Sequence, residues 1–203
     1  MWALIEDGSI TKHLSGNRGI TIGDIQYSRN IFSFRWTNAE REAIGLYEVV
    51  FDNTNKKDEA YYTNTNQSFA FAGGVVTASY GSATANPHAD TLFTAQDEID
   101  GKGTEGEVAV EGLKTKKIRT IKQQAASELA NTDWYIVRKA DADTSVPSAI
   151  TNHRAAVRTK CAEMETAITN AADTPAIETL YTYTKQEDGS VTRPLGEMPT
   201  LEV

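Results

Sequence analysis

The chain has 203 residues, of which 39% are hydrophobic and 24% charged, and its formal net charge is −8. A single cysteine excludes an internal disulfide, and one cysteine with three scattered histidines offers no zinc-ligand cluster. No apolar run approaches the roughly 18 residues that a membrane span needs, so we expect no membrane insertion. We expect the protein to be made in a cytoplasm.

The charge is unevenly distributed along the chain. Residues 113–160 hold ten basic and four acidic residues, whereas residues 84–112 and 161–203 are both strongly acidic. A basic segment between two acidic ones does not offer the continuous positive field that phosphate contacts require. We therefore expect no nucleic-acid binding, and we interpret the pattern as docking between segments or onto an acidic partner.

Residues 1–83 are predicted to form a small β-rich module. The pair Asp7-Gly8 lies between two apolar runs, which is typical of a two-residue hairpin because both turn positions need a positive φ. Gly73-Gly74 indicates a second hairpin. We expect five or six strands in this module.

One short helix is predicted within this module. Thr37 and Glu40 have the spacing of a capping box, in which each side chain accepts a hydrogen bond from the other residue's amide. The spacing predicts a helix over residues 38–44. Gly45 then provides the left-handed conformation that commonly ends a helix, and an apolar strand follows.

Residues 84–112 are predicted to be an acidic linker. Gly, Thr, Ala, Asp and Glu dominate this segment, and its few aliphatic residues show no periodicity. Asp97, Asp100 and Glu105 lack the spacing of a calcium-binding loop. We therefore predict no metal site here.

Residues 113–172 are predicted to form a helical hairpin. The first helix runs to about Asn131, and the second begins near Pro147 and is longer, so its far end needs cover from the tail or from another chain. The lysines in the first turns either are solvated or face a partner or the acidic linker. Residues 173–203 are predicted to be an extended tail. The apolar stripes are Ile118, Ile121, Ala125 and Leu129, then Ile150, Val157, Cys161, Met164 and Ile168.

Residues 113–160 resemble the carboxy-terminal segment of bacteriophage tail-fibre assembly proteins. Both share four elements in the same order: a leucine, the tripeptide Thr-Asp-Trp, a downstream proline, and a helix. In that helix an aromatic residue or His is followed by Arg, two variable residues, an aliphatic residue and a second Arg. The order of hairpin, capped helix, glycine and strand near the start of the chain also resembles modules of phage tail proteins. The motif residues are Leu129, Thr132, Asp133, Trp134, Pro147, His153, Arg154, Val157 and Arg158.

These motif residues have two readings. In the first they belong to the core of the hairpin: Trp134 plugs the crossing of the two helices, and Asp133 caps a helix or pairs with Arg154 or Arg158. Residues 134–137 are then a compact apolar plug, and residues 138–145 a loop. In the second they contact a partner directly. The first reading predicts that binding uses an exposed helix face, the linker and the tail.

No catalytic constellation is predicted. His13, His88 and His153 are far apart in the sequence, and we interpret each as a surface or packing residue. Cys161 lies on the apolar stripe and is predicted to be a small hydrophobic residue. No cofactor-binding motif is present in the sequence.

The sequence thus predicts an α+β protein, with a β-rich module, a linker, a helical hairpin and a tail. The resemblance implies a non-enzymatic, chaperone-like protein of the bacterial host cytoplasm. Such a protein binds a tail-fibre polypeptide and helps it to fold, to trimerise or to attach to baseplate proteins. The alternative is a permanent structural component of the virion tail that links fibre and baseplate, and a cell-envelope hydrolase is the third reading. Self-association is left open.

Overall fold

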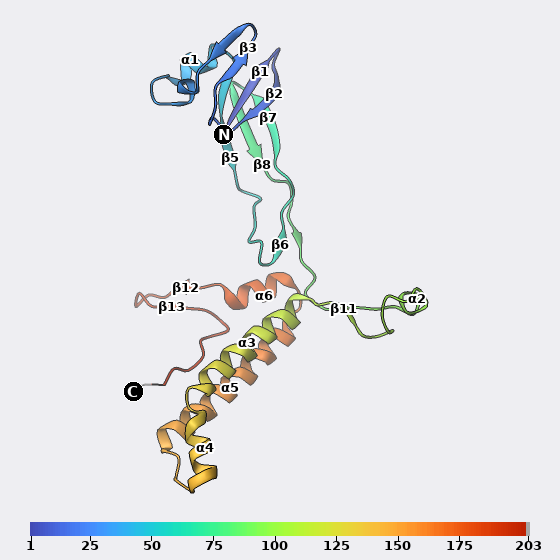
Figure 1. Ribbon diagram of the computed structural model, residues 1–203, viewed down its shortest axis with the longest axis vertical. Coiled ribbons are helices and arrows are strands. Elements are labelled where there is room, and N and C mark those ends of the chain that lie inside the picture. Colours follow the sequence, from blue (N-terminus) through green and yellow to red (C-terminus); the bar gives the residue numbers. More distant parts are fainter. Residues whose placement is uncertain (202–203) are drawn as a thin grey trace. The chain divides into compact units, whose positions relative to one another are not determined.

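The computed structural model describes residues 1–201, and its fold is α+β, as predicted (Figure 1). The chain divides into two compact units, Met1–Thr84 and a second that begins at Ala85. The first is rich in strands, and the second is built on the packed helices α3 (Leu113–Ala130) and α5 (Ser148–Asn170). Within residues 1–201, no helix has both the length and the apolar character that crossing a bilayer requires.

A five-stranded sheet forms most of the first unit. Its strands are β1 (Trp2–Glu6), β2 (Ser9–Leu14), β5 (Leu46–Asp52), β7 (Ser68–Ala72) and β8 (Val75–Ser79), and their order across the sheet is β2-β1-β5-β8-β7. Both predicted hairpins are confirmed, since Asp7 and Gly8 have φ values of 52° and 73°, and Gly73 and Gly74 have 58° and 77°. β5 and β8 are parallel, and the other pairs are antiparallel.

The sheet is curled, so that its two edge strands approach each other. The ring of His13 on β2 lies 4.2 Å from the ring of Phe69 on β7. This contact gives His13 a packing role and helps to shield strand edges that would otherwise be open to pairing. One buried core cluster of the unit consists of Ala3, Val49, Val76 and Ala78, and Leu4 and Leu46 are fully buried as well.

The predicted capping box starts helix α1 (Asn38–Glu42). The carboxylate of Glu40 accepts a hydrogen bond from the Thr37 amide at 2.7 Å, and Thr37 Oγ1 accepts from the Glu40 amide at 3.3 Å. Gly45 has a φ of 78°, as expected for a residue that ends a helix. The remaining elements of this part of the chain are β3 (Ile20–Ile22), β4 (Ile25–Tyr27), the 3-10 helix η1 (Arg29–Phe32), β6 (Tyr62–Thr63) and β9 (Thr84–Ala85).

In the second unit, α3 and α5 lie side by side as the predicted helical hairpin (Figure 1). The stripe predicted on α5 is confirmed, apart from Cys161, which is only half-buried. The α3 stripe is confirmed at Ile121 and Ala125, while Ile118 and Leu129 are half-buried. The buried apolar residues of the pair are Leu113, Ile121, Ala125, Ile150, Val157, Met164 and Ile168.

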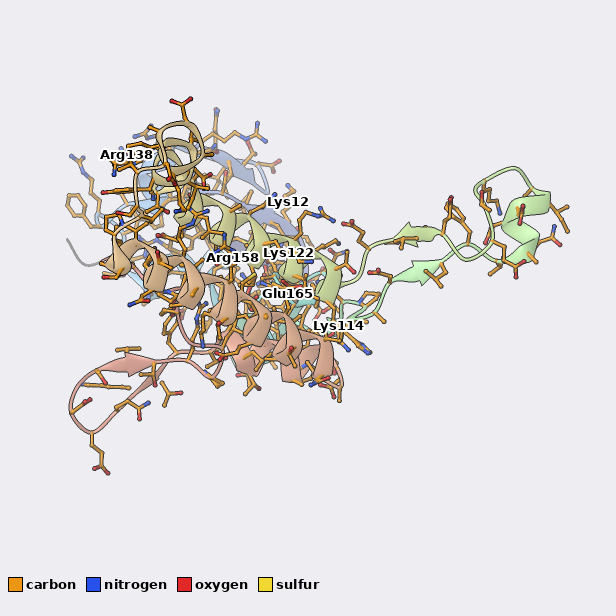
Figure 2. All side chains as sticks on the ribbon, turned by 90° about the horizontal axis from the view of Figure 1, so that it is seen from below. Lys12, Lys114, Lys122, Arg138, Arg158 and Glu165 are labelled. Carbon is orange, nitrogen blue, oxygen red and sulfur yellow. The ribbon has the colours of Figure 1, made fainter. Side chains whose placement is uncertain are left out.

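Two basic side chains of α3 contact α5. Lys114 Nζ donates a hydrogen bond to the carbonyl oxygen of Thr169 at 2.8 Å, near the C-terminal end of α5, where the helix dipole favours a cation. Lys122 Nζ lies 3.1 Å from a carboxylate oxygen of Glu165, and Figure 2 shows these two side chains close together. The antiparallel arrangement thus gives these cations partners in the same unit.

Residues 91–110 form an arm, in place of the structureless linker that we predicted. Thr94 and Asp97 form a second capping box, because the carboxylate of Asp97 accepts from the Thr94 amide and Thr94 Oγ1 accepts from the Asp97 amide. The two strands of the arm are only two and three residues long, which leaves no periodicity to detect. The elements are β10 (Thr91–Leu92), α2 (Ala95–Ile99) and β11 (Val108–Val110), with β10 and β11 paired antiparallel.

Asp90 fixes the base of the arm to the N-terminal end of α3. Its carboxylate accepts hydrogen bonds from the Gly112 amide at 2.7 Å and from the Thr115 hydroxyl at 2.8 Å. The carbonyl oxygens of Pro87 and His88 accept from the first two amides of α3. The first amides of a helix have no acceptor within the helix, and the N-cap residue Gly112 has no side chain that could accept from them. Residues 87–90 therefore cap α3.

We expect Asp90→Ala to lower the melting temperature of the helical unit at about pH 7, and to lower it less at about pH 3. The Gly112 amide, followed by the Thr115 hydroxyl, holds the pKa of the Asp90 carboxyl below its usual range. A carboxyl with a lowered folded-state pKa stabilises the fold above its unfolded pKa, and loses this effect as the pH falls through the folded value. Circular dichroism melting at both pH values, with the exposed Glu187→Ala as the control, measures the difference. An effect of Asp90→Ala that is equal at both pH values would contradict the capping role.

The tail is folded, and the prediction of an extended segment is wrong here. Part of it is the helix α6 (Thr174–Tyr181). Asp173 caps this helix, because its carboxylate accepts a hydrogen bond from the Ala176 amide at 2.8 Å. Leu195 is buried against α3 and α5, in a cluster with Ile121, Met164 and Ile168. The tail therefore supplies the extra cover that the longer second helix needs. Its two strands are β12 (Thr184–Lys185) and β13 (Val191–Thr192).

Candidate binding site at the end of the helical hairpin

A buried arginine joins the end of α3 to the chain that follows it. Nη1 of Arg154, on α5, lies 2.8 Å from the carbonyl oxygen of Leu129, 2.7 Å from Thr132 Oγ1 and 2.8 Å from Asp133 Oδ1. The Arg154 and Thr132 side chains are buried, whereas the carboxylate of Asp133 is largely exposed. The pairing of Asp133 with Arg154, one of the two predicted alternatives, is confirmed.

This network fixes the turn between α3 and the next helix. The last carbonyl groups of a helix have no partner within it, and a cation there satisfies them and also favours the helix dipole. Arg154 meets this need at Leu129 while its guanidinium holds Asp133 on the other side of the turn. Arg158 does not join the network, since its side chain is exposed and donates to the carbonyl oxygen of Arg154 at 3.3 Å.

The residues after the turn form helix α4 (Asp133–Ala142), where we predicted an apolar plug followed by a loop. The role predicted for Trp134 is wrong, because its side chain is 51% exposed. The reason is geometric: Asp133 faces Arg154, and successive residues of a helix point about 100° apart, so Trp134 turns away from the hairpin. The position at the crossing is filled instead by Thr132, whose hydroxyl donates to the Leu129 carbonyl oxygen at 3.0 Å.

Helix α4 exposes most of its apolar side chains. It carries four consecutive large apolar residues from Trp134 to Val137, and none of its ten residues is buried. Ile136 is 44% exposed and Val137 is 66% exposed. Tyr135, between Trp134 and Ile136, is half-buried. We call residues 134–138 the α4 surface.

Arg138 organises the aromatic part of the α4 surface. Its guanidinium lies 4.8 Å from the Trp134 ring centroid and 5.5 Å from that of Tyr135, within the range of a cation–π interaction. The two rings lie against each other, with centroids 3.7 Å apart. The stack therefore presents a rigid aromatic surface with a positive charge on it.

The other motif residues have structural positions. Pro147 directly precedes α5, one residue outside the first turn where we placed it, and its carbonyl oxygen accepts the first helical hydrogen bond, from the Thr151 amide. His153 and Val157 are buried on α5. The structure thus brings together Leu129, Thr132, Asp133 and Arg154 in one network.

The described residues contain no group of three or more His, Cys, Asp or Glu side chains placed to hold a metal ion. In the arm, Lys102 Nζ lies 3.0 Å from carboxylate oxygens of both Asp97 and Asp100, so one lysine pairs with both acids. Hydrogen bonds from Thr94 hold the pKa of Asp97 at about 2, below its usual range. This cluster is a capped and paired surface turn.

Cys161 is the single thiol of the chain, and its surroundings disfavour the thiolate. Burial raises its pKa, and so does the carboxylate of Glu165, to which the thiol donates a hydrogen bond at 3.3 Å. A nucleophilic cysteine needs a lowered pKa. Cys161 therefore behaves as part of the hairpin packing, as the sequence predicted.

Comparison with protein-family models, with curated proteins and with solved structures finds no match. The sequence signal for the α4 surface was present in the run Trp134–Val137, but it was interpreted as a buried plug. The direction of these side chains depends on the turn that Arg154 fixes, which a sequence pattern does not specify.

Proposed function

We propose that this chain is a non-enzymatic binding protein of the bacteriophage tail-fibre assembly type, and that it holds a tail-fibre polypeptide through the α4 surface. One observation carries the binding function: α4 exposes three of its four consecutive large apolar residues, Trp134, Ile136 and Val137, and buries none of its ten residues. The resemblance of the motif around Arg154 to tail-fibre assembly proteins supports a tail-fibre polypeptide as the partner.

A helix of this kind favours a partner on energetic grounds. Isolated helices shorter than about 12 residues are marginal in water, and most helices in proteins gain their stability by packing an apolar face. Helix α4 lacks such packing within the described chain, and only its first turn is held by the Arg154 network. Contact with another polypeptide would bury the exposed side chains and stabilise the helix.

The composition of the α4 surface is that of a binding hot spot. Tryptophan, tyrosine and arginine are the residues that most often dominate the binding energy of protein interfaces. Arg138 adds a positive charge, and the segment 113–160 as a whole is basic. The expected partner segment is therefore apolar with acidic neighbours.

The functional role of the second unit would follow from this arrangement. The paired helices α3 and α5 form a rigid support, and the Arg154 network presents α4 at its end (Figure 1). Helping a fibre to fold or to trimerise requires transient cover of its apolar segments, which such a surface offers. No catalytic residue takes part in this function.

We expect Trp134→Ala to abolish retention of the tail fibre and to change the free energy of unfolding by no more than about 0.5–1 kcal/mol, because the side chain is half-exposed. The measurement is co-purification of the variant with the tail-fibre protein encoded by the same genome, together with thermal melting. Phe34→Ala, which removes an exposed aromatic side chain far from α4 in the sequence, is the matched control and should retain the fibre. Full retention by Trp134→Ala would contradict the proposed site.

A further inference from the structure

The arm, residues 91–110, has a bare apolar face. Leu92 pairs directly with Val108 across the two strands, so the two side chains share one face of the arm. Val110 is also exposed, but it pairs with Thr91 beyond a register shift in the ladder, so it does not continue this face by simple alternation. These side chains are 49%, 46% and 60% exposed, and Ile99 at the end of α2 is 78% exposed.

The neighbouring residue Phe93 is, by contrast, used inside the arm. Phe93 follows Leu92 and points to the other side, where it packs on Gly103. A Cβ atom added at Gly103 would lie 2.3 Å from the Phe93 ring, which explains the glycine. One side of the arm is therefore covered by its own residues, and the apolar side chains on the other side are exposed.

The arm is also strongly acidic. It carries one basic residue, Lys102, which pairs with Asp97 and Asp100. The carboxylates of Glu105 and Glu107 are exposed, and no salt bridge within residues 1–201 neutralises them. The arm thus combines aliphatic side chains with uncompensated negative charge.

Helix α3 carries the complementary surface. Residues 113–127 contain five basic residues and no acidic one. A shallow groove on this helix is lined by Ile118 and Ala126 together with Arg119 and Lys122, and its lining also includes one acidic residue, Glu111. The Arg119 and Lys122 side chains remain 52% and 60% exposed although each has one acidic neighbour, Glu111 or Glu165. We call this surface the α3 groove.

The arm is held away from the α3 groove of its own chain. Its base is fixed at the N-terminal end of α3, by Asp90 on Gly112 and Thr115 and by two backbone hydrogen bonds. Figure 2 shows the arm extending from that end, separate from the side chains of the helices. No residue of the arm lines the α3 groove, so the groove is open to the arm of a different molecule.

We propose that the arm of one copy of this chain docks in the α3 groove of a second copy. The interface is heterologous, since each copy offers one arm and one groove, and apolar contact is combined with opposite charges. This proposal does not rest on the proposed function, because it uses neither α4 nor a tail fibre. Self-association of this kind weakens as salt screens the charges.

Charge reversal in the full-length chain tests the proposal by sedimentation velocity at about 100 μM protein and about 50 mM salt. The arm variant is Glu105→Lys with Glu107→Lys, and the groove variant is Arg119→Glu with Lys122→Glu. Lys12→Glu with Lys185→Glu changes the net charge as the groove variant does, but at exposed positions outside the groove. Circular dichroism confirms that each variant is folded.

We expect the wild type and the control to associate, and each of the two variants to associate more than about tenfold more weakly. An equimolar mixture of the arm variant and the groove variant should associate again, because each reversed surface then meets its complement. A wild type that stays monomeric would overturn the proposal. This is the result expected if the arm binds a different protein and not a second copy of this chain. Equal association of the arm variant and the wild type, or a mixture that stays monomeric, would overturn it as well.

Discussion

Arg154→Ala is expected to destabilise the helical unit by about 2–3 kcal/mol, since hydrogen bonds of a buried charged group contribute more than neutral ones. The change removes the donor that serves the Leu129 carbonyl oxygen, Thr132 Oγ1 and the Asp133 carboxylate. Thr132 is fully buried, so its hydroxyl would lose a partner that water cannot easily replace. Urea unfolding followed by circular dichroism at 222 nm measures the loss.

Arg158→Ala is the matched control for this prediction. Arg158 lies one helical turn after Arg154, but its side chain is exposed, so its removal should cost less than about 0.5 kcal/mol. Equal effects of the two substitutions would show that the loss comes from removing any arginine of α5. In that case the network would not be what fixes the turn before α4.

Leu195→Ala is expected to cost about 2–4 kcal/mol, as a buried leucine replaced by alanine leaves a cavity. The side chain is 2% exposed and packs with Ile121, Met164 and Ile168. The result matters because it decides whether the tail belongs to the core of the helical unit. Chemical unfolding of the full-length chain gives the free energy.

The control for the tail is Val191→Ala, at a β13 position that is 57% exposed, where we expect less than about 0.5 kcal/mol. If Leu195→Ala were equally mild, the tail would be a separate appendage. The extended tail predicted from the sequence would then describe the chain better than the folded one.

Local signals in the sequence predicted much of the fold. The Asp7-Gly8 turn and the Thr37–Glu40 capping box depend on residues at most three positions apart, and the structure contains both. The α5 stripe was also recognisable, because burial of Val157, Met164 and Ile168 follows the helical period. In each case the interaction is set by spacing along the chain.

The errors concern contacts between distant residues. Leu195 lies in the segment predicted to be extended, and its burial depends on α3 and α5, far away in the sequence. The arm was missed although Thr94 and Asp97 have capping-box residue types, because its strands are too short to show alternation. Trp134 was placed inside because it is large and apolar, while its direction is set by the pairing of its neighbour Asp133.

The sequence therefore predicted the charge pair of the candidate site but not its exposed apolar surface. The pair Asp133 and Arg154 could be anticipated, as opposite charges beside a predicted turn. The exposure of Ile136 and Val137 could not, since four apolar residues in a row are more often buried than displayed. This exposed run on α4 is what the proposed binding function explains.

Hydrogen–deuterium exchange of this chain, alone and in complex with the tail-fibre protein of the same genome, tests the central claim most directly. The account predicts rapid exchange across Asp133–Ala142 in the free chain, because this helix buries none of its residues, and strong protection in the complex. A complex in which α4 exchanges as rapidly as in the free chain would contradict the proposed site. Failure of the two proteins to form any complex would contradict the proposed function itself.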